Sequence, residues 1–409
     1  MIEPRTVLLL GASGMGMAPL ALYLQGAGVG VEAYDDRFCE PLRSMMMDSG
    51  ITVLSEPTPT TKPDCVIRSS AIKETDKRVR SFLLQGVPVY QRGDFISRLL
   101  EGKSIVAVVG SHGKTSTTGM LVWGLKQINF SFSYLVGGRF KNDSLASGEW
   151  NRSSVVLLEV DESDGTIDRF SPDYTLALNC EWDHVDHYAD SKAFLKTLGE
   201  LFERTKQGLV FPKGSNIEKL IGKLKFDFNP IAFQPHENPA LFDDSNRRAV
   251  IAMGKSMGVD LGQVDFSLFP GMERRQSVLF ESDGRMVVED YAHHPSELRA
   301  FLANRRLDAP NDLLRVVFQP HRFSRTRAHA KKFAEELSLA DEMYLMQTYG
   351  AFEKFDASGT VEALSGHLPP RFREDAKVYE EFPDLRAALG KKGKGKAKRD
   401  QILFVGAGN

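Results

Sequence analysis

The stretch from residue 105 to residue 127 constrains the fold more than any other part of this chain. The apolar run IVAVV (105–109) leads into the glycine loop GSHGKTS (110–116), and a helix-like segment follows directly. A buried strand, a glycine turn and a helix in this order are typical of α/β domains whose backbone N–H groups and helix N-terminus face an anion. The pattern predicts a phosphate-binding loop in which Lys114 reaches the outer phosphates and Thr115 binds Mg²⁺.

The spacing inside this loop differs from the usual phosphate-loop pattern. Val108 stands where that pattern would place a glycine, and Gly110 lies nearer to the Gly-Lys pair than the pattern requires. The alternative interpretation is a surface turn that contains these residues by chance. The strand-like run before the loop and the helix-like segment after it favour a protein that binds and hydrolyses a nucleoside triphosphate.

A second α/β pattern opens the chain. Residues 5–11 read as a buried strand, the glycine turn GASGMGM and a helix-like stretch follow, and a further strand ends at Asp35. An acid about 20 residues beyond such glycines is the usual contact of a ribose hydroxyl. Strand candidates at 65–67 and 87–89 extend this unit. Pro88 restricts the second candidate to the edge of a sheet, because proline cannot donate to a ladder.

Further strands and helices follow the phosphate loop, and their alternation predicts an α/β fold of three domains. The predicted strands are 154–160, 175–180, 286–291, 314–320, 342–349 and 402–408, and 245–258 is a predicted helix. The predicted domains are a Rossmann-like domain at 1–103, a shortened P-loop ATPase-like domain at 104–261 and a second Rossmann-like domain at 262–409.

Composition excludes several classes of protein. The net charge of −2 gives no reason to expect nucleic acid or an anionic membrane as a partner. The sequence has no apolar run long enough to span a bilayer and no cleavable signal at its start. Cys39, Cys65 and Cys180 lie far apart without metal-ligand spacing. We therefore expect a cytoplasmic protein with reduced thiols, in which the basic segment 391–399 is a solvated loop.

Four polar groups follow predicted strands, at the edge where open α/β sheets bind ligands. They are 159–164, 179–188, 289–295 and 318–326. Glu159 stands near the end of an apolar strand, where a carboxylate is costly unless it meets a cation. Mg²⁺ would satisfy it, with Thr115 and phosphate oxygens completing the shell. An acidic surface turn is the alternative for the acids after Glu159.

Histidines and arginines mark the other groups. The group at 179–188 holds two histidines and three acids, which favours a functional loop over a single hydrogen-bonded structural histidine. In the last group, Arg322 and Arg325 are three positions apart directly after an apolar strand. This spacing predicts a cationic clamp for a carboxylate. A solvated helix start is the alternative.

Taken in order, these motifs resemble those of the Mur ligases. The motifs that carry the resemblance are GASGMGM, Tyr34-Asp35, Ser69-Ser70-Ala71-Ile72, GSHGKTS, EVDESD, NCEWDHVDHY, FPGMERR, EDYAHHP, FQPHRFSRT and the terminal GAG. The resemblance implies ATP-dependent amide formation in peptidoglycan precursor synthesis, with ATP and Mg²⁺ as cofactors. ATP would phosphorylate the lactyl carboxylate of UDP-N-acetylmuramate, and the amine of L-alanine would attack the acyl phosphate. We expect a monomer or a homodimer.

The resemblance also implies roles for single residues. The implied catalytic residues are Lys114, Glu159, His184, Asp290 and His293. The implied ATP-binding residues are Gly110, Ser111, Gly113, Lys114, Thr115, Ser116, Asn246 and Arg275, with Arg274 as the alternative to Arg275. The implied UDP-sugar-binding residues are Gly11, Gly14, Met15, Gly16, Asp35, Ser69, Ser70 and His112. Tyr291, His293, Arg322 and Arg325 would surround the amino acid, and Thr115, Glu159 and His184 would bind metal.

The chain departs from the family pattern in places that bear on the adenine pocket. The stretch before Asn246 is short, Phe242-Asp243 replaces a His-Asn pair, Phe352 replaces a glycine, and the chain ends at Asn409 where relatives continue into another helix. Two alternatives therefore stay open. One is a recycling ligase that attaches an intact tripeptide to the same sugar nucleotide. The other is a catalytically weakened relative that binds nucleotide.

Overall fold

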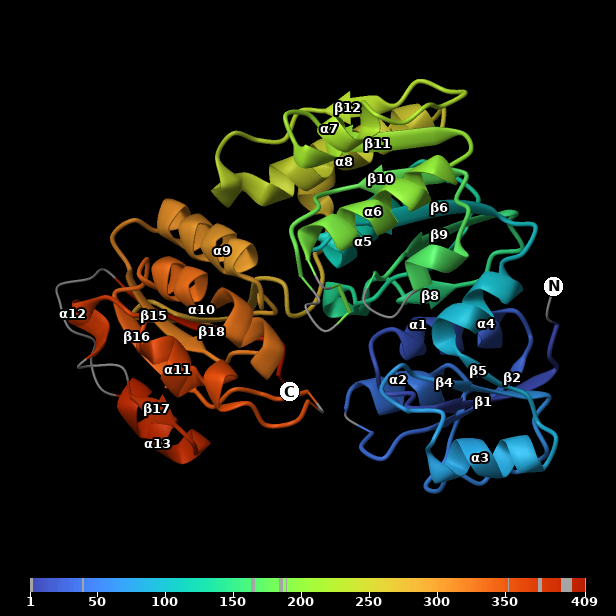
Figure 1. The fold of residues 1–409 in the computed structure, drawn as a ribbon, viewed down its shortest axis with the longest axis horizontal. Coiled ribbons are helices and arrows are strands. Elements are labelled where there is room, and N and C mark those ends of the chain that lie inside the picture. Colours follow the sequence, from blue (N-terminus) through green and yellow to red (C-terminus); the bar gives the residue numbers. More distant parts are fainter. Residues whose placement is uncertain are drawn as a thin grey trace. The chain divides into compact units, whose positions relative to one another are not determined.

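The computed structural model describes residues 3–38, 40–162, 166–183, 187–188, 190–351, 353–373, 377–390 and 399–408. Its strands form three separate sheets with helices on them, which confirms the predicted three-domain α/β architecture (Figure 1). Contacts divide the described residues into two compact units. The first unit lies within residues 1–181, 191–234 and 246–272, and the second within 182–190, 235–245 and 273–409.

The first sheet is wholly parallel, with the strand order β3-β2-β1-β4-β5. Its elements are β1 (Thr6–Leu10), α1 (Met17–Gly26), β2 (Gly30–Tyr34), α2 (Leu42–Asp48), β3 (Thr52–Val53), β4 (Cys65–Arg68), α3 (Lys77–Leu84), β5 (Val89–Gln91) and α4 (Arg92–Leu99). β5 begins one residue after Pro88 and lies at the sheet edge, as the proline predicts.

The central sheet has the order β12-β11-β10-β6-β9-β7-β8, and only its β7–β8 pair is antiparallel. Its elements are β6 (Ser104–Val109), α5 (Lys114–Gln127), β7 (Ser133–Leu135), β8 (Gly148–Glu149), β9 (Val155–Glu159), β10 (Tyr174–Ala177), α6 (Ser191–Glu203), β11 (Gly208–Pro212), α7 (Asn216–Ile221), β12 (Ile231–Phe233) and α8 (Phe242–Ser256). β6 lies in the middle of this sheet. Its residues from Ile105 onward are all buried, because parallel strands at this position are covered on both faces.

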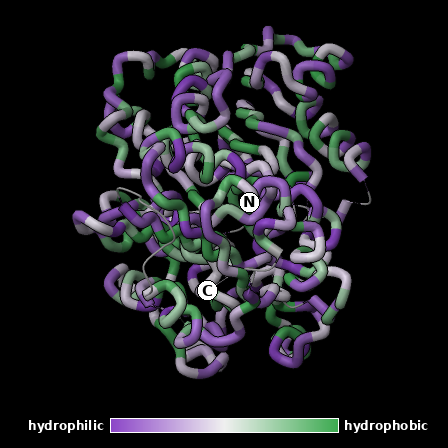
Figure 2. Tube along the Cα trace, turned by 90° about the vertical axis from the view of Figure 1, so that its left-hand side faces the viewer, coloured by the Kyte–Doolittle hydropathy of each residue, from purple (hydrophilic) through white to green (hydrophobic). Residues whose placement is uncertain are grey.

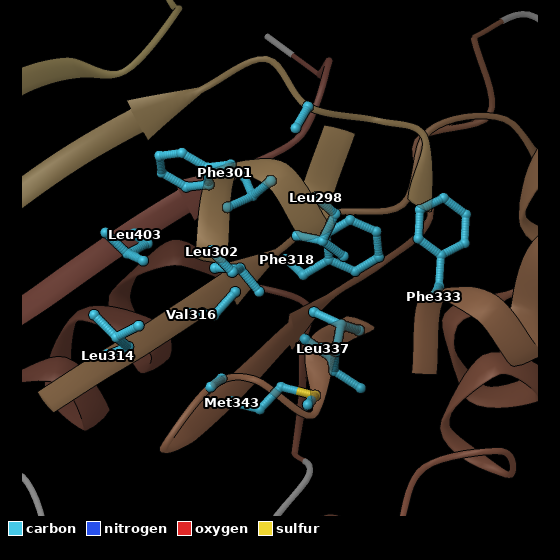
Figure 3. Close-up of a cluster of buried hydrophobic side chains, with 14 of the residues drawn as sticks. Leu298, Phe301, Leu302, Leu314, Val316, Phe318, Phe333, Leu337, Met343 and Leu403 are labelled. Atoms are coloured by element: carbon cyan, nitrogen blue, oxygen red, sulfur yellow. The ribbon is translucent and has the colours of Figure 1, made fainter. Parts of the chain in front are cut away.

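The third sheet has the order β13-β14-β18-β15-β16-β17, with β13 antiparallel to β14 at one edge. Its elements are β13 (Ser277–Ser282), β14 (Arg285–Asp290), α9 (Pro295–Asp308), β15 (Leu313–Phe318), α10 (Phe323–Leu337), β16 (Glu342–Met346), α11 (Val361–Ser365), α12 (Pro370–Arg373), β17 (Val378–Tyr379), α13 (Phe382–Leu389) and β18 (Asp400–Val405). Figure 3 shows apolar side chains of α9, α10 and the strands gathered in one core, among them Leu298, Phe318 and Phe333.

The boundaries predicted at 103/104 and 261/262 stay a prediction. The apolar core of the central sheet includes Phe266 and Met272, which lie beyond the second boundary.

Hydrophobic and hydrophilic residues are intermixed along the whole trace (Figure 2). Within the described ranges, each helix is too short or too polar to cross a membrane.

Candidate active site

The phosphate loop joins the end of β6 to the start of α5. Gly110 and Gly113 have φ angles of 141° and 77°, in the region that favours glycine, and Gly113 is the N-cap residue of α5. A Cβ atom at Gly110 would lie 3.1 Å from the backbone nitrogen of Asn179. The glycines thus allow a tight turn against the segment that follows β10. The N–H groups at the start of α5 have no partner within the helix, so this end suits an anion.

Lys114 is the first residue of α5, and its ammonium is held inside the protein. Its Nζ donates to the carbonyl oxygen of Gly110 at 2.7 Å and to both carboxylate oxygens of Glu162 at 2.8 and 2.9 Å. Burial alone would lower the pKa of Lys114, but the carboxylates of Glu162, Asp161 and Glu159 raise it above its ordinary value. The lysine is therefore positively charged at neutral pH.

Thr115 and Glu159 bring a hydroxyl and a carboxylate together beside this lysine. The Thr115 hydroxyl donates to the two oxygens of Glu159 at 3.0 and 3.2 Å, and the N–H of Gly137 donates to one of them at 3.2 Å. Glu159 is the last residue of β9, next to β6 in the sheet. Such oxygens are the ligands that Mg²⁺ prefers, so this pair fits the predicted metal. The third predicted ligand, His184, lies outside the described residues.

Hydrogen bonds from the segment after β10 hold the middle of the loop. The N–H of His112 donates to the side-chain oxygen of Asn179 at 3.1 Å, and the Asn179 amide donates back to the His112 carbonyl at 2.9 Å. The Ser111 hydroxyl donates to the carbonyl of Glu181. On the other side, the Asn246 side-chain oxygen lies 3.8 Å from where a Cβ of Gly113 would be. The predicted adenine contact is therefore beside the loop.

The predicted UDP-sugar residues of the first sheet lie together at the ends of β1, β2 and β4. Gly11 has a φ of 76°, and a Cβ there would come within 2.5 Å of the Ser69 hydroxyl. The Asp35 carboxylate accepts hydrogen bonds from the N–H groups of Ser13 and Arg37, both at 3.0 Å. Asp35 thus fixes the glycine loop that begins α1, which the sequence pattern alone did not indicate.

Four more residues of this predicted set lie in the turns after β1 and β4. Gly14 and Gly16 lie in the turn before α1, and the Gly14 carbonyl accepts from the Met17 N–H at 2.8 Å. Met15 is 38% exposed, a high value for its residue type that leaves its side chain accessible on the turn. Ser70 is exposed after β4.

The second unit presents Asp290 and Tyr291 at the end of β14. Asp290 is buried and accepts from the N–H groups of Gln276 and Ala292 at 2.9 and 2.8 Å. Burial raises its pKa to about 6 although Arg275 lowers it. The guanidinium carbons of Arg274 and Arg275 lie 4.9 and 5.0 Å from the centre of the Tyr291 ring, within the range of cation–π contacts.

A group of four histidines lies nearby, and we call it the histidine cluster: His293, His294, His321 and His329. The rings of His293 and His321 are 6.0 Å apart, and those of His294 and His329 are 5.0 Å apart. Burial lowers the pKa of His293 to about 4, against the opposite effect of Glu297. Burial likewise lowers the pKa of His321 to about 3 and that of His329 to about 4. These three imidazoles are neutral at pH 7.

Arg325 makes a buried ion pair that the sequence did not indicate. Its guanidinium donates two hydrogen bonds to the carboxylate of Asp183, at 2.8 and 3.0 Å, and both side chains are at most 4% exposed. Arg322, the N-cap of α10, has a φ of 69°, a strained value for a residue with a side chain. The fork of Arg325 is thus engaged by Asp183, and the predicted clamp for an amino-acid carboxylate stays a prediction.

The structure brings the predicted residues together in two sets. The first unit holds the phosphate loop (110–116), Glu159, Asn246 and the UDP-sugar residues. The second unit holds Arg275, Asp290, Tyr291, Arg322 and Arg325. Phe352 lies outside the described residues. Sequence reasoning missed Glu162 and Asp183 as partners of Lys114 and Arg325. Glu162 lies in the motif EVDESD and Asp183 in NCEWDHVDHY. Membership of these motifs was the signal that could have indicated a role for the two acids.

Two family models match this chain over most of its length. "Mur ligase middle domain" matches residues 108–260, and "Mur ligase, glutamate ligase domain" matches residues 273–408. Among curated proteins, the chain is 30% identical to a UDP-N-acetylmuramate–L-alanine ligase of Kineococcus radiotolerans, with 98% of this chain and 93% of that protein covered. A protein of the same name from Myxococcus xanthus is 28% identical, with coverage of 98% and 92%.

Two solved structures are also similar to this chain. The UDP-N-acetylmuramate–alanine ligase of Thermotoga maritima superposes with a TM-score of 0.79 at 25% identity, covering 100% of this chain and 96% of that one. A murein peptide ligase of Psychrobacter arcticus superposes with a TM-score of 0.71 at 19% identity, covering 99% and 96%. The second likeness is one of fold alone.

Proposed function

This chain belongs to the Mur ligase family, and we propose that it joins L-alanine to the lactyl carboxylate of UDP-N-acetylmuramate at the expense of ATP. The observation that carries the proposal is the site at the end of β6. A charged lysine, a hydroxyl–carboxylate pair and the N-terminus of α5 converge there on one loop. These are the groups that phosphoryl transfer requires, because its catalysis is mostly positioning and charge stabilisation.

In this proposal Lys114 and the N-terminus of α5 hold the phosphates of ATP. Thr115 and Glu159 would hold Mg²⁺, which neutralises charge on the transferring phosphoryl group. The product of that transfer is an acyl phosphate on the sugar nucleotide. The amine of the amino acid then attacks the acyl carbon, and phosphate leaves with one oxygen of the original carboxylate.

In the same proposal, the two sets of residues bind different substrates. The glycine loop that Asp35 fixes would bind the UDP-sugar, since backbone N–H groups at a helix start suit a diphosphate. The second unit, with its arginines and neutral histidines, would bind the amino acid. A neutral imidazole has an unprotonated ring nitrogen that can accept a hydrogen bond from the amine of the amino acid. The reaction would supply a cytoplasmic precursor of peptidoglycan.

An assay of phosphate release tests the function. Purified protein is given Mg²⁺–ATP and UDP-N-acetylmuramate with L-alanine, glycine, L-serine or the tripeptide, each in turn. We expect the largest kcat/KM with L-alanine. A larger value with the tripeptide would favour the recycling reaction, and no release with any amine would leave only nucleotide binding.

A further inference from the structure

The lysine of the phosphate loop has an anionic partner within its own chain. An ammonium group has three N–H donors. The two oxygens of Glu162 and the Gly110 carbonyl lie within 2.9 Å of Lys114 Nζ, which accounts for all three. A phosphate that binds Lys114 must therefore take over contacts that the protein already makes.

Burial reduces the screening of this ion pair by water. The side chain of Lys114 is 11% exposed and that of Glu162 is 1% exposed, so water screens the two charges little. A second lysine–glutamate pair, Lys126 with Glu149, lies at the other end of the same helix with distances of 2.6 and 2.8 Å. Its side chains are 28% and 34% exposed, which makes it a matched but more solvated control.

We propose that Glu162 competes with the nucleotide phosphates for Lys114 and so sets the affinity of the phosphate loop for ATP. This inference rests on the proposed binding of ATP at this loop. A carboxylate offers two oxygens to the lysine much as a phosphate group does, and it also repels an incoming phosphate. Glu162 is thus a positioning residue that acts through Lys114.

The competition has a measurable size. The apparent Kd of a ligand equals its intrinsic Kd divided by the fraction of molecules that can bind it. If Glu162 holds the lysine in nine of ten molecules, the apparent Kd is raised about tenfold. Glu162→Gln keeps the shape of the side chain and removes its charge. We expect this variant to bind nucleotide about fivefold to tenfold more tightly than the unchanged protein.

Glu162→Gln should lower the thermal stability of the protein and raise its affinity for nucleotide. Without nucleotide, Glu162→Gln leaves the ammonium of Lys114 buried beside a weaker partner, so the protein should unfold at a lower temperature. A merely structural role for Glu162 predicts that the variant loses stability and also binds nucleotide more weakly, or equally well. Glu162→Asp keeps the charge but shortens the side chain, and it should tighten binding by a smaller factor.

Calorimetric titration with Mg²⁺ and a non-hydrolysable ATP analogue tests the inference on the full chain. The unchanged protein, Glu162→Gln, Glu162→Asp and the control Glu149→Gln are compared, with thermal unfolding as a check that each is folded. Tighter binding by the Glu162 variants, with an unchanged Kd for the control, supports the competition. Unchanged or weaker binding by the Glu162 variants overturns it. If the unchanged protein fails to bind the analogue, the proposed function fails and the inference with it.

Discussion

Removing the carboxylate of Asp183 should destabilise the second unit more than any exposed substitution there. Asp183→Ala leaves the guanidinium of Arg325 buried, with both of its hydrogen bonds to that carboxylate lost. Removal of one partner from such a buried pair typically costs about 3–5 kcal/mol. The Nδ1 of His321, 3.2 Å from the Arg325 guanidinium, cannot replace a negative charge.

The expected shift in unfolding temperature follows from this cost. For a unit of this size, each 1 kcal/mol lowers the midpoint by roughly 2–4 °C. Asp183→Ala should therefore lower the midpoint of the second unit by about 6–20 °C. The transition of the first unit should not move, because both members of the pair belong to the second.

Scanning calorimetry of a double-mutant cycle measures the pair itself. The four proteins are the unchanged chain, Asp183→Ala, Arg325→Met and the double variant. Because the double variant leaves neither charge buried, it should be more stable than Asp183→Ala alone. A loss below about 1 kcal/mol for Asp183→Ala, or additive effects of the two substitutions, would refute a buried pair of this kind.

Three further predictions concern the site and the histidine cluster. Lys114→Ala should lower the rate of ligation by about 100-fold or more, since it removes the cation of the loop, and circular dichroism should show an intact fold; near-normal phosphate release would contradict this role. Glu159→Ala should raise the Mg²⁺ concentration needed for half-maximal activity while leaving the affinity for UDP-N-acetylmuramate unchanged by calorimetry, and an equal loss of both would indicate a structural role. Acidification should destabilise the second unit between about pH 6.5 and pH 4, because three cluster histidines have folded-state pKa values of about 3 to 4 and take up protons on unfolding. Asp290, with a pKa of about 6, opposes this effect, because it binds a proton in the folded state. On balance unfolding takes up about two protons, so the free energy of unfolding should fall by roughly 2–3 kcal/mol for each pH unit. Equal urea midpoints at pH 7 and pH 5 would contradict this prediction.

The strong local patterns of the sequence predicted the central part of the fold. The run before Gly110 is a buried strand in the middle of a parallel sheet, and such strands read as continuous apolar stretches. Pro88 also predicted the sheet edge at β5, because proline lacks the donor that a central strand needs. These features depend on a few neighbouring residues, so periodicity and composition reveal them.

Short and antiparallel elements were beyond such reasoning. β7 and β8 have three and two residues, too few for an alternating pattern. β13 carries Val278, Leu279 and Phe280, each more than half exposed, so its side chains do not alternate between apolar and polar faces.

The partners within the candidate site were also hidden. Glu162 is 48 positions from Lys114, and Asp183 is 142 positions from Arg325. Motifs identified all four residues as members of functional segments. Only the folded chain shows which charges meet, because no local spacing relates residues so far apart.

The transfer of oxygen from the sugar nucleotide to phosphate tests the central claim most directly. UDP-N-acetylmuramate labelled with ¹⁸O in its lactyl carboxylate is incubated with the protein, Mg²⁺–ATP and L-alanine, and the phosphate is analysed by mass spectrometry. Activation of the carboxylate as an acyl phosphate predicts one ¹⁸O atom in the phosphate for each amide formed. Phosphate released without the label would show that water attacks ATP instead, and would contradict the account.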